Sequence, residues 1–178
     1  MNVTCVRVDL AQRAQHRLGL PLVEDFVHPE EFGTYRDLKR DFPDLRFAAG
    51  EQQSTIWDFR RLIHESRVDV LQPDLSRCGG MTVAAQLAAE PGTADREIVT
   101  HSWLTDLLHA YSLHYLATLP AATWVEFNVA QSRLSRGVAR DHLSLSADGT
   151  VSVPDGPGIG VDVDEDFVRS RQLNEVDW

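Results

Sequence analysis

Short apolar segments rich in β-branched residues recur along the chain at an interval of roughly 25 residues, which is typical of alternating strand and helix units. Each segment is short enough to form a strand that is buried on both faces of a parallel sheet. The predicted strands span residues 21–23, 45–49, 68–72, 97–100 and 123–127.

Between these strands, apolar residues recur at a spacing of three or four, which predicts helices with one apolar face. The predicted helices span residues 10–18, 32–42, 56–63, 81–89 and 107–116. Alternating units of this kind predict a parallel α/β fold, either an open sheet or a (β/α)₈ barrel. No glycine-rich phosphate turn follows the first strand, so the fingerprint of a dinucleotide-binding sheet is absent.

The composition indicates an ordinary globular chain with an acidic surface. The 178 residues carry a formal net charge of −10, which repels nucleic-acid backbones. The basic stretch 36–46 is interleaved with Asp37, Asp41 and Asp44, so we expect a solvated helix there and no nucleic-acid partner. Without a signal peptide or a long apolar window, we expect no membrane association and a cytoplasmic location. The two cysteines, Cys5 and Cys78, are expected to be reduced.

An ionisable residue stands at or just after the end of each predicted strand. These residues are Glu24, Glu51, Asp74, His101 and Glu126. Because the carboxyl ends of parallel strands face the same side of a sheet or barrel, we expect the five side chains to share one site.

The residue types at these positions predict proton abstraction assisted by a metal. Acids that lie close together need a cation to offset their repulsion, and the oxygen ligands of Glu24 and Glu51 favour magnesium, calcium or manganese over zinc. Such a metal can hold a substrate carboxylate and stabilise the enediolate formed when the adjacent carbon loses a proton. His101 is the candidate base, Asp74 its partner, and Glu126 a candidate acid or hydrogen-bond donor.

The strand-end residues lie in motifs that together cover nearly the whole chain. The motifs are Val23-Glu24-Asp25-Phe26, Ala49-Gly50-Glu51, Leu71-Gln72-Pro73-Asp74, Arg77-Cys78-Gly79-Gly80, Thr100-His101-Ser102, Trp124-Val125-Glu126, Val153-Pro154-Asp155 and Pro157-Gly158-Ile159-Gly160. In this order, the series resembles the C-terminal barrel half of the mandelate racemase and muconate lactonizing enzyme group of the enolase superfamily.

The resemblance implies a role for each of these residues. Glu24 and Glu51 correspond to the second and third ligands of Mg²⁺, Asp74 and His101 to a dyad in which the histidine is the base, and Glu126 to the electrophilic acid. The dyad favours the mandelate racemase-like branch, whose members are mostly acid-sugar dehydratases with a few racemases. Proton abstraction with Mg²⁺ and an enediolate is general to the superfamily.

Other features of the resembled family do not occur in this sequence. Members begin with a capping domain, followed by a Lys-x-Lys strand and an Asp-x-Asn strand whose aspartate is the first metal ligand; here Lys39 is the only lysine. Asn2 stands near the position of the Asn in Asp-x-Asn, and both Asn2 and Trp103 are candidate substrate-binding residues. Met1 is therefore expected to correspond to an internal residue of a longer ancestral chain, which upstream coding sequence for Asp-x would support.

The length predicts an incomplete barrel. A (β/α)₈ barrel takes about 250 residues, so residues 1–178 are expected to form a single partial barrel domain of about five βα units without the capping domain. Residues 140–178 would be a C-terminal tail that packs back toward a capping domain.

Two functions remain open from the sequence. In the first, the chain contributes to an enzyme acting on a small carboxylate such as an acid sugar, as a homo-oligomer or with a chain that supplies the missing barrel half. In the second, it is a truncated, non-catalytic fragment that serves as a binding or oligomerisation element. The open strand edges of a partial barrel predict association in both cases.

Overall fold

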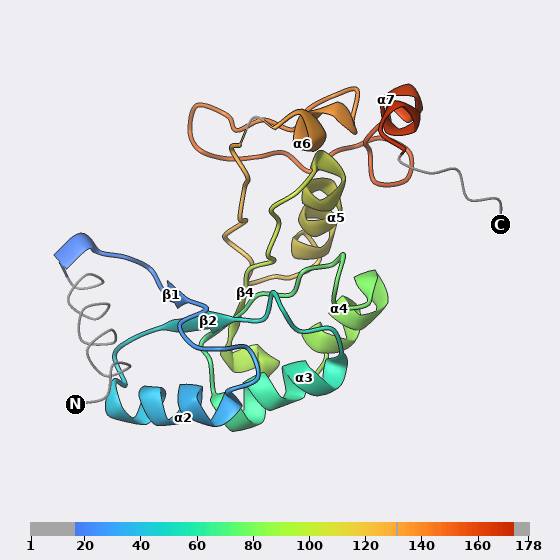
Figure 1. Ribbon diagram of the computed structural model, residues 1–178. Coiled ribbons are helices and arrows are strands. Elements are labelled where there is room, and N and C mark those ends of the chain that lie inside the picture. Colours follow the sequence, from blue (N-terminus) through green and yellow to red (C-terminus); the bar gives the residue numbers. More distant parts are fainter. Residues whose placement is uncertain (1–16, 131, 173–178) are drawn as a thin grey trace. The chain divides into compact units, whose positions relative to one another are not determined.

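The computed structural model describes residues 17–130 and 132–172 (Figure 1). The chain divides into two compact units, 1–100 and 101–178, and each is described by itself. Asn2, Cys5 and most of the helix predicted for residues 10–18 lie outside the described residues.

The first unit contains a four-stranded parallel sheet with the strand order β1-β2-β3-β4. The strands are β1 (Val23–Glu24), β2 (Phe47–Ala49), β3 (Val70–Leu71) and β4 (Glu97–Ile98). Each falls within or overlaps a predicted strand but is shorter. The parallel α/β class is therefore confirmed for this unit.

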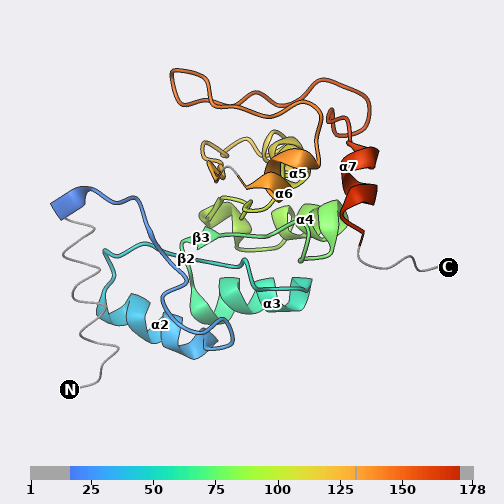
Figure 2. The same cartoon turned by 45° about the horizontal axis from the view of Figure 1, so that its top comes forward.

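Helices connect the strands of the first unit. They are α2 (Phe32–Asp41), α3 (Ile56–Arg61) with a π-helical continuation η1 (Leu62–Ser66), α4 (Gly80–Ala88) and a 3₁₀ turn η2 (Thr93–Asp95). Both views show α2 and α3 on the same side of β2 (Figures 1 and 2). Helix α3 begins at a capping box in which the Thr55 hydroxyl accepts a hydrogen bond from Asp58 N–H and the Asp58 carboxylate accepts one from Thr55 N–H.

The apolar core of the first unit follows the predicted periodicity. Phe32, Tyr35 and Leu38 are the buried residues of α2, and Ala48 and Val70 form part of a buried cluster between the strands. The basic stretch 36–46 differs from the prediction at Lys39. Lys39 is not simply solvated, because its ammonium group lies 2.7 Å and 2.9 Å from the two carboxylate oxygens of Asp69.

The second unit is built around helix α5 (Asp106–Leu116), which was predicted at 107–116. Two short helices follow, α6 (Arg133–Gly137) and α7 (Glu165–Ser170), and an antiparallel bridge pairs Ala139 with Val163. Neither short helix was predicted from the sequence. No helix within the described ranges is long and apolar enough to cross a membrane.

The strand predicted at residues 123–127 is wrong. Within residues 17–130 and 132–172, this segment forms no strand ladder and is not one of the four strands of the sheet. Its β-branched and aromatic residues favour extended backbone, yet a strand also needs a partner with which to exchange backbone hydrogen bonds. Near its end, the Glu126 carboxylate accepts a hydrogen bond from Ser102 N–H, and the Phe127 ring stacks on the His109 ring.

Candidate active site

Three of the predicted site residues follow neighbouring strands at one edge of the sheet. Glu24 is the last residue of β1, Glu51 comes two residues after β2, and Asp74 comes three residues after β3. Because these strands are parallel and adjacent, their carboxyl ends lie at the same edge. The structure thus brings these three positions to one side of the first unit, as the sequence predicts.

The chain turns immediately after Glu24. Asp25 has a φ of 42°, a left-handed conformation that is uncommon for a residue other than glycine. Its N–H still donates to the Ala48 carbonyl at 3.1 Å, so the ladder extends by one hydrogen bond beyond β1. Glu24 itself is exposed.

A glycine immediately before Glu51 allows two strand ends to approach closely. Gly50 has a φ of 141°, and a Cβ placed there would lie 2.9 Å from the backbone nitrogen of Gln72. The following loop is joined to the loop after β3, because Arg77 Nη1 donates to Gln52 Oε1 at 2.7 Å. Gln52 Nε2 in turn donates to Glu51 Oε1 at 2.6 Å. These contacts orient the Glu51 carboxylate.

Asp74 is held by its own loop and is only 3% exposed. Its Oδ1 atom accepts hydrogen bonds from the Ser76 N–H at 2.7 Å and from the Ser76 hydroxyl at 2.6 Å. Cys78 follows in the same loop and is buried. Burial raises the pKa of the Cys78 thiol, and the charge of Asp74 adds to this effect, so a neutral thiol is favoured and metal ligation by Cys78 is disfavoured.

The other predicted site residues belong to the second unit. His101 is its first residue and comes three residues after β4 ends. Glu126 lies near it in the fold, since Glu126 Oε2 accepts a hydrogen bond from Ser102 N–H at 3.2 Å. The Trp103 side chain is 55% exposed, and its role in substrate binding stays a prediction.

The donor set of Glu24 and Glu51 fits Mg²⁺ by its chemistry. Both residues offer carboxylate oxygens, the ligands that this hard cation prefers. Across residues 17–130 and 132–172, no group of three or more His, Cys, Asp or Glu side chains is arranged to hold a metal ion. Two carboxylates from this chain therefore need further ligands from substrate, water or additional protein.

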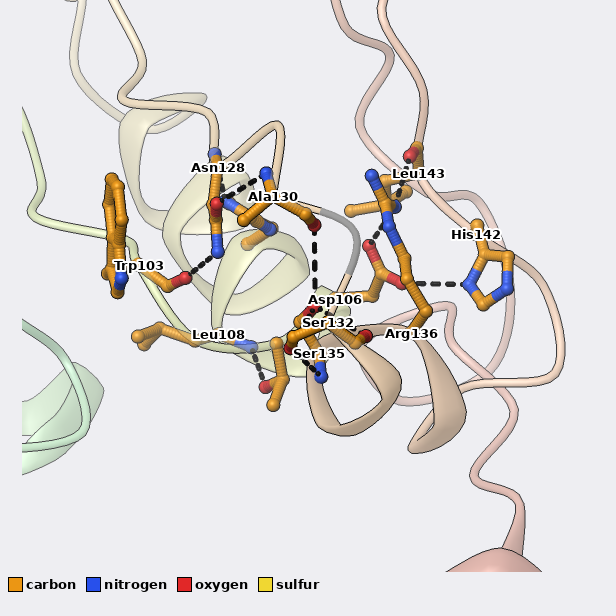
Figure 3. Close-up of polar contacts among 12 residues, drawn as sticks. Trp103, Asp106, Leu108, Asn128, Ala130, Ser132, Ser135, Arg136, His142 and Leu143 are labelled. Carbon is orange, nitrogen blue, oxygen red and sulfur yellow. Dashed lines mark hydrogen bonds and ion pairs between the residues drawn. The ribbon is translucent and has the colours of Figure 1, made fainter.

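Sequence reasoning missed the polar network around the start of α5 in the second unit (Figure 3). The buried Asp106 carboxylate contacts Arg136 Nη1 at 3.4 Å and His142 Nδ1 at 3.0 Å. Asn128 and the buried His109 form a second part of this network. The signal available for Asp106 and His109 was a polar residue next to apolar residues in α5. Their partners lie 19 to 36 positions away along the chain.

The fold and the strand-end residues define a parallel α/β protein with acidic groups at the carboxyl edge of its sheet. A family model described as "Enolase C-terminal domain-like" matches residues 6–167. The chain therefore belongs to the C-terminal domain family of the enolase superfamily, and its relatives lie in the mandelate racemase group.

Two characterised relatives and one solved structure illustrate the similarity. The chain is 31% identical over 168 residues to D-galactonate dehydratase from Ralstonia pickettii, covering 88% of this chain and 42% of the relative. It is 28% identical over 163 residues to D-galactarolactone cycloisomerase from Agrobacterium fabrum, covering 87% and 43%. The structure of 3,6-anhydro-D-galactonate cycloisomerase from Zobellia galactanivorans matches with a TM-score of 0.79 at 28% identity, covering 89% and 44%. The chain thus spans less than half the length of these relatives.

Proposed function

We propose that this chain contributes most of an active site that removes the proton next to the carboxylate of a small acid sugar, within a magnesium-dependent dehydratase or a mandelate racemase-like enzyme. The observation that supports this proposal most strongly is the placement of Glu24, Glu51 and Asp74 after neighbouring parallel strands. The named activities of the relatives, a dehydratase and two cycloisomerases of acid sugars or their lactones, support the substrate class.

Each residue then has a chemical role. Glu24 and Glu51 would hold Mg²⁺ through carboxylate oxygens, and the bound cation would offset the negative charge of the substrate carboxylate. His101 takes the proton from the adjacent carbon onto a ring nitrogen. The assignment of Asp74 as its partner rests on the family resemblance. In a dehydratase the neighbouring hydroxyl then leaves as water after protonation, whereas in a racemase a proton returns to the carbon.

Glu126 is proposed as an acid or hydrogen-bond donor toward the substrate. Its Oε2 atom accepts from Ser102 N–H, so a proton carried by this carboxyl group is expected on Oε1. The hydrogen bond fixes the orientation of the group next to His101, and correct orientation is a large part of the effectiveness of a catalytic acid.

The remaining ligands would come from additional protein. The chain has no Asp-x-Asn or Lys-x-Lys motif, and a further copy would lack them too, so a companion polypeptide is proposed to complete the site in the cytoplasm, whereas a further copy would only cover the open sheet. The outer strands β1 and β4 each pair on one side only within the described sheet, and unpaired edges favour such association.

The open edges and the short length also favour a second candidate function. The chain covers 42% and 43% of the two relatives named above. In this alternative it is a non-catalytic element that binds or oligomerises with other protein. Magnesium binding and turnover distinguish the two candidates.

Calorimetric titration of the purified chain with Mg²⁺ tests the ligand assignment. We expect binding that Glu24→Gln and Glu51→Gln each weaken about tenfold or more, because each removes a charged oxygen ligand. Glu30→Gln is the matched control, since Glu30 is an exposed glutamate in the same unit. Absence of binding at millimolar Mg²⁺, or equal binding by all variants, would contradict the assignment for this chain.

A screen of acid sugars for dehydration and racemisation tests the base. We expect activity that His101→Asn abolishes and that His64→Asn, at an exposed histidine, leaves unchanged. Activity that survives His101→Asn would exclude His101 as the base. Magnesium binding without turnover, with a defined oligomeric mass, would favour the non-catalytic candidate.

A further inference from the structure

Two segments of the second unit that carry predicted catalytic residues are joined by hydrogen bonds. Ser102, next to His101, donates its N–H to Glu126 Oε2 at 3.2 Å. Two residues beyond Glu126, the Asn128 side-chain amide donates to the Trp103 carbonyl (Figure 3). Segment 101–103 and segment 126–128 are therefore connected at two points.

Asn128 is itself fixed from two directions. Its N–H donates to His109 Nε2 on helix α5 at 3.0 Å, and its Oδ1 atom accepts from Ala130 N–H at 2.8 Å. Asn128 is buried, so the loss of a partner would leave a polar group unsatisfied away from water. Both the oxygen and the nitrogen of its side-chain amide hold the backbone around it.

His109 lies where a neutral ring is required. It is 3% exposed and stacks on Phe127, with ring centroids 4.8 Å apart and an interplanar angle of 20°. Because Nε2 accepts the Asn128 N–H, this nitrogen carries no proton and a neutral ring has its proton on Nδ1. Burial lowers the pKa of His109, against smaller opposing effects of Asp106 and the Ser102 backbone, and this favours the neutral form.

We propose that His109 and Asn128 are positioning residues that hold Glu126 and the His101 segment in their working arrangement. The proposal rests on the proposed function, because it concerns the acid and the base assigned there. Neither residue needs to touch the substrate. His109 fixes Phe127 by stacking and Asn128 by a hydrogen bond, and these are the two residues that follow Glu126.

Amide hydrogen exchange tests the proposal without requiring enzymatic activity. In the full chain, His109→Leu should accelerate exchange at Asn128 and Ser102 by about five- to tenfold, the change expected from losing one net hydrogen bond. His109→Gln offers an amide oxygen as a replacement acceptor and should restore most of the protection. His114→Leu, on the same helix, loses only a contact with the Ile159 carbonyl and should leave both amides unchanged.

Asn128→Ala provides a second measurement if His109→Leu does not fold. It removes the contact with Trp103 and should accelerate exchange at Ser102 by a similar factor. Unchanged Ser102 exchange in Asn128→Ala and in every folded His109 variant would overturn the proposal. Accelerated exchange supports it, whether or not the chain turns over substrate.

Where turnover is measured, the kinetics separate positioning from binding. We expect His109→Leu to lower kcat with little change in KM, and His109→Gln to recover kcat, because the substrate contacts themselves are retained. An equal loss in His109→Leu and His109→Gln, together with unchanged exchange, would contradict the positioning role. Absence of activity in the unmodified chain, even together with the additional protein that completes the site, would refute the proposed function and leave the exchange result to decide this inference.

Discussion

Replacement of Gly50 by alanine tests the close approach of Gly50 to the Gln72 backbone, immediately before Glu51. A Cβ at this position would lie 2.9 Å from Gln72 N and 3.1 Å from Gln72 C and O, all of them backbone atoms at the end of β3. These atoms cannot move aside as the end of a flexible side chain can. The φ of 141° adds strain, because L-residues rarely adopt it.

The expected cost follows from these two effects. Backbone strain at such a conformation costs about 1–3 kcal/mol, and displacement of the β3 end adds a further contribution of about 1–3 kcal/mol, similar to other overpacking. We therefore expect Gly50→Ala to lower the free energy of unfolding by about 2–6 kcal/mol, as measured by urea denaturation.

Gly19→Ala is the matched control for this measurement. Gly19 also has a positive φ, of 66°, but nothing lies within 4 Å of the position that a Cβ would take there. The substitution should cost only about 1–2 kcal/mol, because it forces an alanine into the left-handed conformation. Both substitutions reduce the entropy of the unfolded chain equally, so their difference isolates the close approach and the rarer φ. Equal losses of stability in Gly50→Ala and Gly19→Ala would refute this reasoning.

Two further measurements test contacts that the sequence did not predict. Lys39→Met should lower the free energy of unfolding by about 2 kcal/mol, because it leaves the partly buried Asp69 carboxylate without the Lys39 ammonium group. Arg40→Met, at an exposed ion pair, should leave the free energy of unfolding nearly unchanged. Equal effects of the two substitutions would contradict the distinction. Burial lowers the pKa of His109, so the unfolded chain binds a proton that the folded chain does not, and stability should fall as the pH decreases from about 6.5 toward the folded pKa. His109→Gln should remove that part of the pH dependence in urea denaturation, and an unchanged pH dependence would be evidence against it.

The parallel units were predictable because their signals are local. The run 45–49 is apolar apart from Arg46 and begins a new unit at the expected interval. The helical spacing of Phe32, Tyr35 and Leu38 places three side chains on one face. The same signals failed at 123–127, where the sequence pattern resembles a strand but the structure provides no ladder. Strand formation depends on a partner, and a partner is not encoded in the segment itself.

Contacts between residues that are distant along the chain explain the other differences between the predicted and the observed structure. Lys39 lies among alternating charges that indicate a solvated face, yet its partner Asp69 is 30 positions away at the start of the β3 region. Asp69 Oδ2 also accepts the Phe47 N–H at 2.9 Å, so one carboxylate links a helix to the backbone of β2. No local periodicity contains that information.

In the candidate site, the local sequence determines where the residues lie, whereas contacts with other residues determine how their side chains are oriented. Glu24, Glu51 and Asp74 could be placed from the sequence because the end of a parallel strand fixes the side of the sheet at which a residue emerges. The orientation of each carboxylate has a different origin, since Ser76 holds Asp74 and Gln52 holds Glu51. For Glu126 the orienting group is the Ser102 N–H, 24 positions away. A substitution that leaves all five predicted site residues intact can therefore still change their orientation, which is why His109 and Asn128 are the informative positions to test.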